Sequence, residues 1–294
     1  MSAPILVQSP TDSTVRVDPA EWLVPLPLSA FPSLKRDLHL EYRLLRSLTE
    51  NDDMVTRQFV DKNGLNRYRD IQPFSHNRVL LGSNGNYINA SHMHHMRPGR
   101  FIACQGPLAH TIGDHWQMVW EQDIGSIFAI GKLAEGMVEK CALYWPTDPT
   151  SFQQYVSRSG EEFTVSLEST SCEKSEIRKL RISKNNETRL VTHFHFTEWP
   201  DHQVVDTESL LALVEDVLVS QVDDKCTLIH CSAGVGRTGC VLTLASLLAQ
   251  VRRGETNLSV LNTAMRLRLD RLYMMQTTGQ YLSVYAALAL VASS

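Results

Sequence analysis

HCSAGVGRTG, at residues 230–239, lies between a short, mostly apolar run at 226–229 and a longer apolar segment at 237–253 that is closed by Gly254. The first run predicts a buried strand, and the second predicts a helix. A glycine-rich turn before a helix presents several backbone N–H groups that have no helical partner and can converge on one anion. The stretch therefore predicts an anion site between a strand and a helix.

Cys231 lies at the base of this predicted site, and Arg237 follows in the same loop. Gly234 and Gly236 permit the positive-φ turns that such a loop requires. The helix dipole, the loop amides and the arginine can lower the pKa of a cysteine from about 8.5 to about 3.5–7.5. The planar guanidinium can hold two oxygens of a phosphoryl group. We therefore predict a nucleophilic cysteine that peroxide oxidises reversibly.

Cys172 shows that spacing alone does not identify the nucleophile, because Arg178 follows it at the same distance. The residues between them contain no glycine, and Glu173 and Glu176 stand where a phosphate dianion would have to bind. We expect Cys172 to be structural or exposed.

An acid is also needed, because the leaving oxygen must be protonated when a phosphoryl group moves to sulfur. Asp201, in Trp199-Pro200-Asp201, follows a predicted strand and lies in a loop, where a carboxylate can swing in and exclude water. Taken alone, Asp201 fits a helix cap or a turn residue better than a catalytic acid. Gln276 and Gln280, taken alone, fit a cap and an exposed helical residue.

The overall composition is that of a globular protein, with 43% hydrophobic and 20% charged residues among 294. The formal net charge of -4 gives no general basic face for nucleic acid. No run approaches the roughly 18 apolar residues of a membrane span, and the N-terminus lacks the pattern of a signal peptide. We expect a cytoplasmic protein without a membrane span.

Six cysteines are spread along the chain without paired C-x-x-C spacing, which indicates reduced, packed thiols. The stretch HMHH at 92–95 has no cysteine or carboxylate cluster beside it, so we interpret these histidines as surface residues. We expect neither a metal nor a cofactor.

Prolines and apolar periodicity divide the chain into elements. Residues 1–33 contain six prolines and predict an extended arm on the surface. The predicted helices begin near 34, 113, 208, 237, 257 and 277, and the predicted strands cover 86–90, 162–168, 177–183, 189–196 and 226–229. The three strands between 162 and 196 predict an antiparallel meander. This mixture indicates an α/β or α+β fold.

Eight ordered motifs carry a resemblance to a known family. They are NRYRDI (66–71), NYINAS (86–91), QGP (105–107), HWQMVWEQ (115–122), YWP (144–146), WPD (199–201), HCSAGVGRTG (230–239) and QTTGQY (276–281). In residues, order and separation they resemble the tyrosine-specific, cysteine-dependent protein tyrosine phosphatases. The resemblance implies an α/β fold, with a highly twisted mixed β-sheet flanked by helices, in a catalytic domain at 34–294.

The resemblance also implies catalytic roles for the matched residues. Cys231 would be the nucleophile, Arg237 the phosphate clamp, and Asp201 the general acid and then the base. Gln276 and Gln280 would position the hydrolytic water. His230 would orient the loop from behind, and the Thr238 hydroxyl would contact the sulfur.

The phosphate would be bound by the loop residues Ser232, Ala233, Gly234, Val235, Gly236 and Arg237. Glu135 would steady Arg237, and Asp70 would accept a hydrogen bond from the substrate backbone. Tyr68 would stack on the substrate ring in a deep slot. Phosphotyrosine is long enough to reach the sulfur at the bottom of this slot, whereas phosphoserine is too short.

Two positions depart from the pattern of that family. The loop after Asp201 reads HQVV at 202–205, without the usual glycine and proline, so its closure rate is expected to differ. Tyr273 stands where the family often has glycine, and we expect its ring to narrow access beside the main pocket.

Three functions remain open at the level of sequence. The first is hydrolysis of phosphotyrosine in proteins through a cysteinyl-phosphate intermediate, and the second is a silent module that only binds phosphotyrosine. The third is a phosphoinositide phosphatase, which the absence of basic residues at 232–236 disfavours. The presence of Cys231, Arg237 and Asp201 favours the first. The expected partners are phosphotyrosine-containing proteins, and the expected state is a monomer.

Overall fold

The computed structural model describes residues 5–8, 14–58, 64–96, 99–172, 175–199, 204–221 and 224–293. In this part of the chain, nine strands form one sheet in the order β10-β11-β12-β13-β7-β14-β6-β5-β4. Their bounds, in that order, are Phe152–Val156, Glu162–Cys172, Glu176–Lys184, Glu187–Phe196, Ile124–Ile130, Cys226–His230, Arg100–Cys104, Asn86–His92 and Arg78–Leu81.

The sheet is mixed, because four neighbouring strands are parallel and the outer ones are antiparallel. β13, β7, β14 and β6 run parallel, whereas the pairs on either side of them are antiparallel. The predicted meander is therefore present as β11, β12 and β13. β14 is buried at every position, as a central parallel strand covered on both faces should be.

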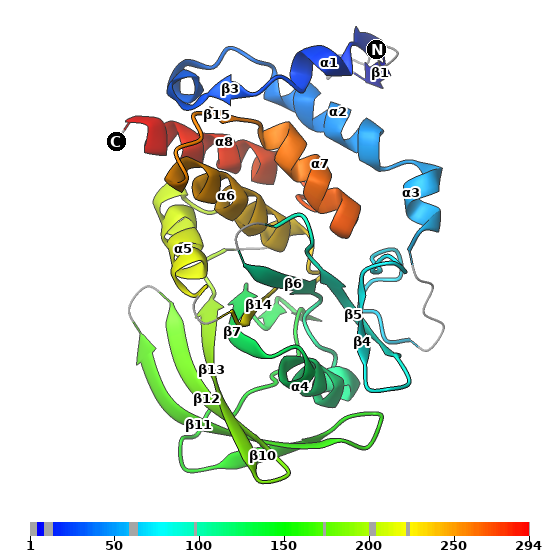
Figure 1. The fold of residues 1–294 in the computed structure, drawn as a ribbon, viewed down its shortest axis with the longest axis vertical. Coiled ribbons are helices and arrows are strands. Elements are labelled where there is room, and N and C mark those ends of the chain that lie inside the picture. The colour runs from blue at the N-terminus through cyan, green and yellow to red at the C-terminus, as the bar shows by residue number, and fades with distance from the viewer. Residues whose placement is uncertain are drawn as a thin grey trace.

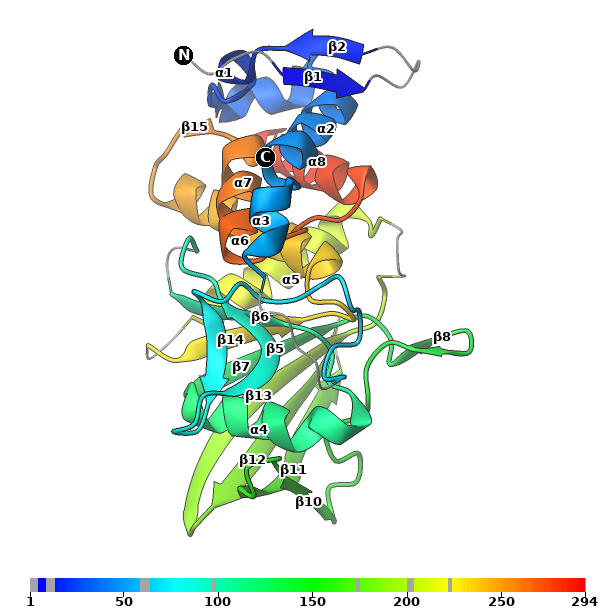
Figure 2. The same ribbon diagram turned by 90° about the vertical axis from the view of Figure 1, so that its right-hand side faces the viewer.

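Helices cover both faces of the sheet (Figure 1). The helix α4 (Ile112–Glu121) lies on one side, and α5 (Thr207–Val219), α6 (Gly236–Arg252), α7 (Val260–Asp270) and α8 (Thr278–Ser293) lie on the other, as Figure 2 also shows. Alternate residues of β6 separate into two cores, because Phe101 and Ala103 join the core beneath α5–α8 while Ile102 and Cys104 join the core beneath α4. The predicted fold class, a twisted mixed sheet flanked by helices, is confirmed.

Helix boundaries follow capping residues rather than the first apolar position. The helix α2 (Leu38–Thr49) begins after Asp37, whose carboxylate accepts from the Leu40 N–H, although periodicity predicted a start near 34. Likewise α7 begins after the N-cap Ser259, because Asn257–Leu258 pair as β15 with β3 (Leu26–Pro27). Two shorter helices, α3 (Asp52–Thr56) and η2 (Ala109–Thr111), follow α2 and precede α4 respectively.

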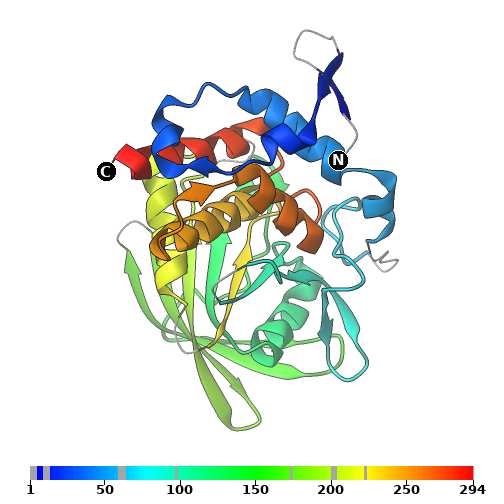
Figure 3. The same cartoon turned by 45° about the horizontal axis from the view of Figure 1, so that its top comes forward.

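The prediction of an extended arm at 1–33 is wrong for most of its described part. An antiparallel hairpin, β1 (Ile5–Gln8) with β2 (Thr14–Val17), packs on α2 at the N-terminal end of the molecule (Figure 3). It is followed by α1 (Pro19–Trp22), β3 (Leu26–Pro27) and η1 (Leu28–Ser33).

A helix cap and a tertiary contact account for the structure in this segment. Asp18 caps α1 with Pro19 as its first residue, and Phe31 is buried and stacks on Tyr285 of α8 at 5.5 Å between ring centroids. The segment is thus folded onto the helices. The division of the chain at residues 33 and 34 stays a prediction.

None of the helices in the described residues has the length and apolar character needed to cross a membrane. The cytoplasmic location and the monomeric state stay predictions.

Candidate active site

The catalytic loop predicted from the sequence lies at the carboxyl edge of the parallel strands. β14 ends at His230, which is in register with Cys104 at the end of β6 and with Ala129 near the end of β7. α6 begins at Gly236, so the predicted sequence of strand, loop and helix is present. Ligands of α/β sheets bind at this edge, because the loops that follow parallel strands converge there.

The loop holds Cys231 where an amide faces its sulfur. The thiol is nearly buried, and the Gly234 N–H donates to Cys231 Sγ at 3.3 Å. Gly234 has a φ of +71°, and a Cβ there would lie 2.0 Å from the Cys104 carbonyl oxygen. Glycine is therefore required at Gly234 both by its dihedral angle and by the close approach of β6.

Arg271 supports the loop from outside, and no pattern in the sequence singles it out. Its buried guanidinium donates to the carbonyl oxygens of Gly234 at 2.9 Å and Ala233 at 3.0 Å, and also to the Asn89 side chain at 2.6 Å. Because these carbonyls are directed towards Arg271, they do not oppose an anion inside the loop. Burial disfavours the charged form and lowers the pKa of Arg271 from its ordinary value.

His230 lies behind the loop, as expected, within a buried polar chain. Its Nδ1 lies 3.1 Å from the Cys231 carbonyl oxygen and its Nε2 lies 2.7 Å from the Tyr144 hydroxyl, which is 2.9 Å from His193 Nε2. Burial lowers the pKa of His230 to about 4. The neutral ring can then donate from Nδ1 to the loop carbonyl and accept at Nε2 from Tyr144.

Arg237 is held by a hairpin that follows β7. The strands β8 (Ala134–Glu135) and β9 (Val138–Glu139) carry Glu135, whose Oε1 accepts from Arg237 Nη2 at 2.9 Å. Arg237 Nη1 also donates to the Ile130 carbonyl at 3.3 Å, and Lys140 lies 3.8 Å from the other Glu135 oxygen. The guanidinium is therefore fixed before any phosphate binds.

A pocket opens above Cys231 and brings together most of the residues predicted from the sequence. Its volume is about 130 Å³, and the described residues that line it are Tyr68, Asp70, Ile71, Cys231, Ser232, Ala233, Gly236, Arg237, Gln276 and Gln280. The Tyr68 hydroxyl lies 3.0 Å from Ser232 Oγ, so the aromatic wall is tied to the loop.

Two expected residues differ from their predicted placement, and a third lies outside the described residues. Asp201 lies outside the described residues, although Trp199 before it is fully buried. The Thr238 hydroxyl is buried and has no hydrogen-bond partner among the described residues, so the expected contact to the sulfur is not made. The Val235 side chain is buried in an apolar cluster with Ile71 and Ala233 and does not line the pocket.

Tyr273 has a φ of +66° and packs against the apolar cluster of Ile71, Ala233 and Val235, which Tyr68 also contacts. Its ring therefore lies beside the wall of the pocket.

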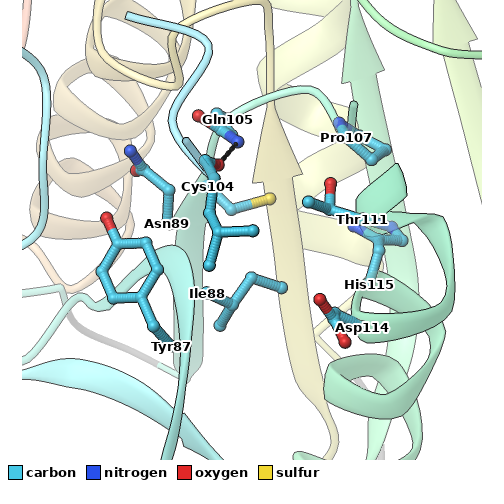
Figure 4. A pocket seen from close by; sticks show the side chains of 10 residues that line it. Tyr87, Ile88, Asn89, Cys104, Gln105, Pro107, Thr111, Asp114 and His115 are labelled. Carbon is cyan, nitrogen blue, oxygen red and sulfur yellow. Dashed lines mark hydrogen bonds between the residues drawn. The ribbon is translucent and has the colours of Figure 1, made fainter. Parts of the chain in front are cut away.

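A second, much smaller pocket lies between β5, β6 and α4 (Figure 4). Its volume of about 10 Å³ is close to the minimum for a single water, and the sulfur of Cys104 points into it. Burial raises the pKa of Cys104 and raises that of Cys141 to about 12, so both thiols stay protonated. No residue predicted for catalysis lines this pocket among those described.

Cys172 and the histidines of the stretch 92–95, which the sequence did not assign to the active site, lie in separate places in the structure. Cys172 is exposed at the end of β11. His95 Nδ1 lies 2.8 Å from Asp270 Oδ1, and the rings of His92 and His94 stack at 5.8 Å. The described residues contain no group of three or more potential metal ligands.

Comparisons with known proteins extend over most of the chain. A family model described as "Protein-tyrosine phosphatase" matches residues 62–290. The chain is 35% identical over 238 residues to "Tyrosine-protein phosphatase non-receptor type 7" of Homo sapiens, covering 77% of this chain and 63% of that protein. It is also 35% identical over 253 residues to "Receptor-type tyrosine-protein phosphatase eta" of Mus musculus, covering 82% of this chain and 20% of that protein.

A solved structure described as "Structural basis of PTPN18 fingerprint on distinct HER2 tyrosine phosphorylation sites" superposes with a TM-score of 0.81 at 25% identity, covering 91% of this chain and 99% of that chain. The curated relatives are longer, and the chain spans less than two thirds of their length.

Proposed function

Because the chain belongs to the protein-tyrosine phosphatase family, we propose that it hydrolyses phosphotyrosine in proteins through a cysteinyl-phosphate intermediate. The observation that carries the proposal is the loop at the start of α6, where an amide faces the Cys231 sulfur and Glu135 holds Arg237 beside it. A thiolate and a fixed guanidinium at a helix N-terminus together form a site for a phosphoryl group.

In the first step, the Cys231 thiolate attacks phosphorus while the bond between phosphorus and the tyrosine oxygen breaks. Asp201 gives its proton to the leaving phenolate oxygen. The loop amides and Arg237 bind the three phosphoryl oxygens as negative charge spreads over them.

In the second step, water attacks the cysteinyl phosphate and Asp201 takes up a proton from it. The bond between phosphorus and sulfur breaks, and Cys231 leaves as a thiolate with inorganic phosphate as the product. Gln276 and Gln280 hold the attacking water, which agrees with their place in the lining of the pocket.

The shape of the pocket supports phosphotyrosine as the substrate. Tyr68 walls the pocket and is held by Ser232, so the thiol lies at the base of a slot that a phenyl ring can enter. Asp70 is exposed at the mouth, where it can accept from a peptide backbone. Among the described residues that line the pocket, Arg237 is the only cation. A pocket with one cation suits a single phosphate group better than a phosphoinositide with several phosphates.

The experiment measures hydrolysis of a phosphotyrosyl peptide by the full chain in the presence of a chelator. Cys231→Ser should abolish turnover and keep peptide binding, whereas Cys172→Ser, with the same spacing to an arginine, should leave turnover unchanged. Asp201→Ala should lower kcat far more than it raises KM, because it removes a group that acts in the transition state. Turnover that requires a divalent ion, or that persists in Cys231→Ser, would contradict the mechanism.

A further inference from the structure

The helix α2 contacts the backbone of the segment that carries Gln276. Tyr42 of α2 is buried, and its hydroxyl donates to the Met275 carbonyl oxygen at 3.1 Å. Arg268 of α7 donates to the same oxygen at 2.9 Å. Tyr42 lies outside residues 62–290, to which the family model matches.

The Met275 carbonyl belongs to the peptide unit that leads into Gln276. The N–H of this planar unit, on Gln276, donates to Gln280 Oε1 at 2.8 Å. The unit is therefore held at both ends, by Tyr42 and Arg268 at its oxygen and by Gln280 at its nitrogen. Rotation of this peptide would move Gln276 and break the shorter of the two backbone hydrogen bonds that hold Gln280 Oε1, the other being from the Thr277 N–H at 3.3 Å.

The backbone at this point also requires support. Met275 has a φ of +58°, in the left-handed region that is unfavourable for a residue with a Cβ. Its N–H donates to the Val235 carbonyl oxygen at 3.0 Å, which ties the segment to the catalytic loop. The Tyr42 hydroxyl helps to hold a conformation that the chain would not adopt by itself.

We propose that Tyr42 is a positioning residue for the second chemical step, because it fixes the peptide that orients Gln276 and Gln280. The proposal rests on the proposed function, in which these two glutamines hold the attacking water. Tyr42 does not line the pocket, so attack of Cys231 on the substrate should not depend on it. Loss of its hydroxyl slows hydrolysis of the cysteinyl phosphate and spares its formation.

The test is Tyr42→Phe, which removes the hydroxyl and keeps the ring that packs near Tyr281 at 5.5 Å. With an aryl phosphate in a stopped-flow instrument, we expect kcat about tenfold lower and kcat/KM unchanged. A tenfold change corresponds to about 1.4 kcal/mol, which is near the upper end of what one hydrogen bond contributes. A burst of phenolate close to one equivalent of enzyme should precede the slow steady state, because the intermediate accumulates.

Tyr285→Phe is the matched control. It removes another buried hydroxyl between α2 and α8, one of the two that donate to Glu41, without touching residues 274–276. It should leave kcat and the burst as in the unmodified protein. An unchanged kcat in Tyr42→Phe, or an equal fall in kcat and kcat/KM, would overturn the proposal. A wild-type protein without Cys231-dependent turnover would instead show that the proposed function is wrong.

Discussion

At the scale of single residues, the shape of the catalytic loop depends on a glycine that no residue with a Cβ can replace without moving its neighbours. Gly234 is the clearest case, because the loop needs a left-handed residue there and β6 leaves no room for a Cβ. Gly254, which follows the C-cap Arg253 of α6, has a φ of +83° and no neighbouring atom within 4 Å of a Cβ placed on it. The two glycines therefore separate the effect of the dihedral angle from the effect of crowding.

We expect Gly254→Ala to lower the free energy of unfolding by about 1–2 kcal/mol and to leave turnover unchanged, because only the left-handed φ opposes the methyl group. Gly234→Ala should lower it further and reduce turnover at least tenfold, because the loop must move away from Cys104. Denaturant unfolding and peptide hydrolysis measure the two effects. Full turnover in Gly234→Ala would show that the loop does not need its observed shape.

At the scale of elements, a short hairpin outside the main sheet holds the phosphate-binding arginine. β8 and β9 pair at only two positions, Ala134 with Glu139 and Glu135 with Val138, and the Met137 side chain between them is fully exposed. Glu135 is the contact that joins this hairpin to Arg237. On β9, Glu139 makes a comparable ion pair with Arg67 at 3.2 Å but is half exposed.

Glu135→Gln should lower kcat/KM about 10- to 100-fold, because it removes the negative charge that faces the buried guanidinium of Arg237. Binding of inorganic phosphate, measured as competitive inhibition, should weaken in parallel. The control Glu139→Gln should change either quantity less than about threefold, because an exposed ion pair contributes little. Equal effects of the two substitutions would contradict the role given to the hairpin.

At the scale of the whole molecule, four buried histidines gather between α4 and the strands that lead to the site. They are His115, His193, His195 and His230, and their rings contact Tyr144 or Trp145. Burial lowers the pKa of each, to about 4 for His230. Below about pH 6.5 the unfolded chain takes up protons at these histidines that the folded protein does not bind.

The free energy of unfolding should therefore fall as the pH is lowered from about 6.5 towards 4, by at most about 1.4 kcal/mol per pH unit for each histidine. Burial raises the pKa of Asp270, which acts in the opposite direction but through one group. Urea unfolding at pH 7 and pH 5 measures the change, and His193→Gln should make it smaller. Equal unfolding free energies at the two pH values would contradict the prediction.

Several features of this protein were determined by sequence alone, because they rest on neighbouring residues. The apolar strand, the glycine turn and the helix that form the catalytic loop are contiguous between 226 and 253, so their hydrogen bonding and periodicity are local. The meander and the helices were predictable for the same reason. Local signals gave a wrong prediction at 1–33, where the prolines indicated an extended arm. The segment is instead folded onto the helices, because Phe31 is buried against Tyr285 of α8.

Only the tertiary structure decided what holds the catalytic loop and its arginine. Arg271 and Tyr42 have no local pattern that separates them from other arginines and tyrosines of the chain, because their partners lie in other elements. The Tyr42 hydroxyl meets a carbonyl 233 positions further along the chain. Such contacts follow from how helices and strands pack against one another. The spacing of residues in the sequence predicts only local structure, within one helix, turn or strand.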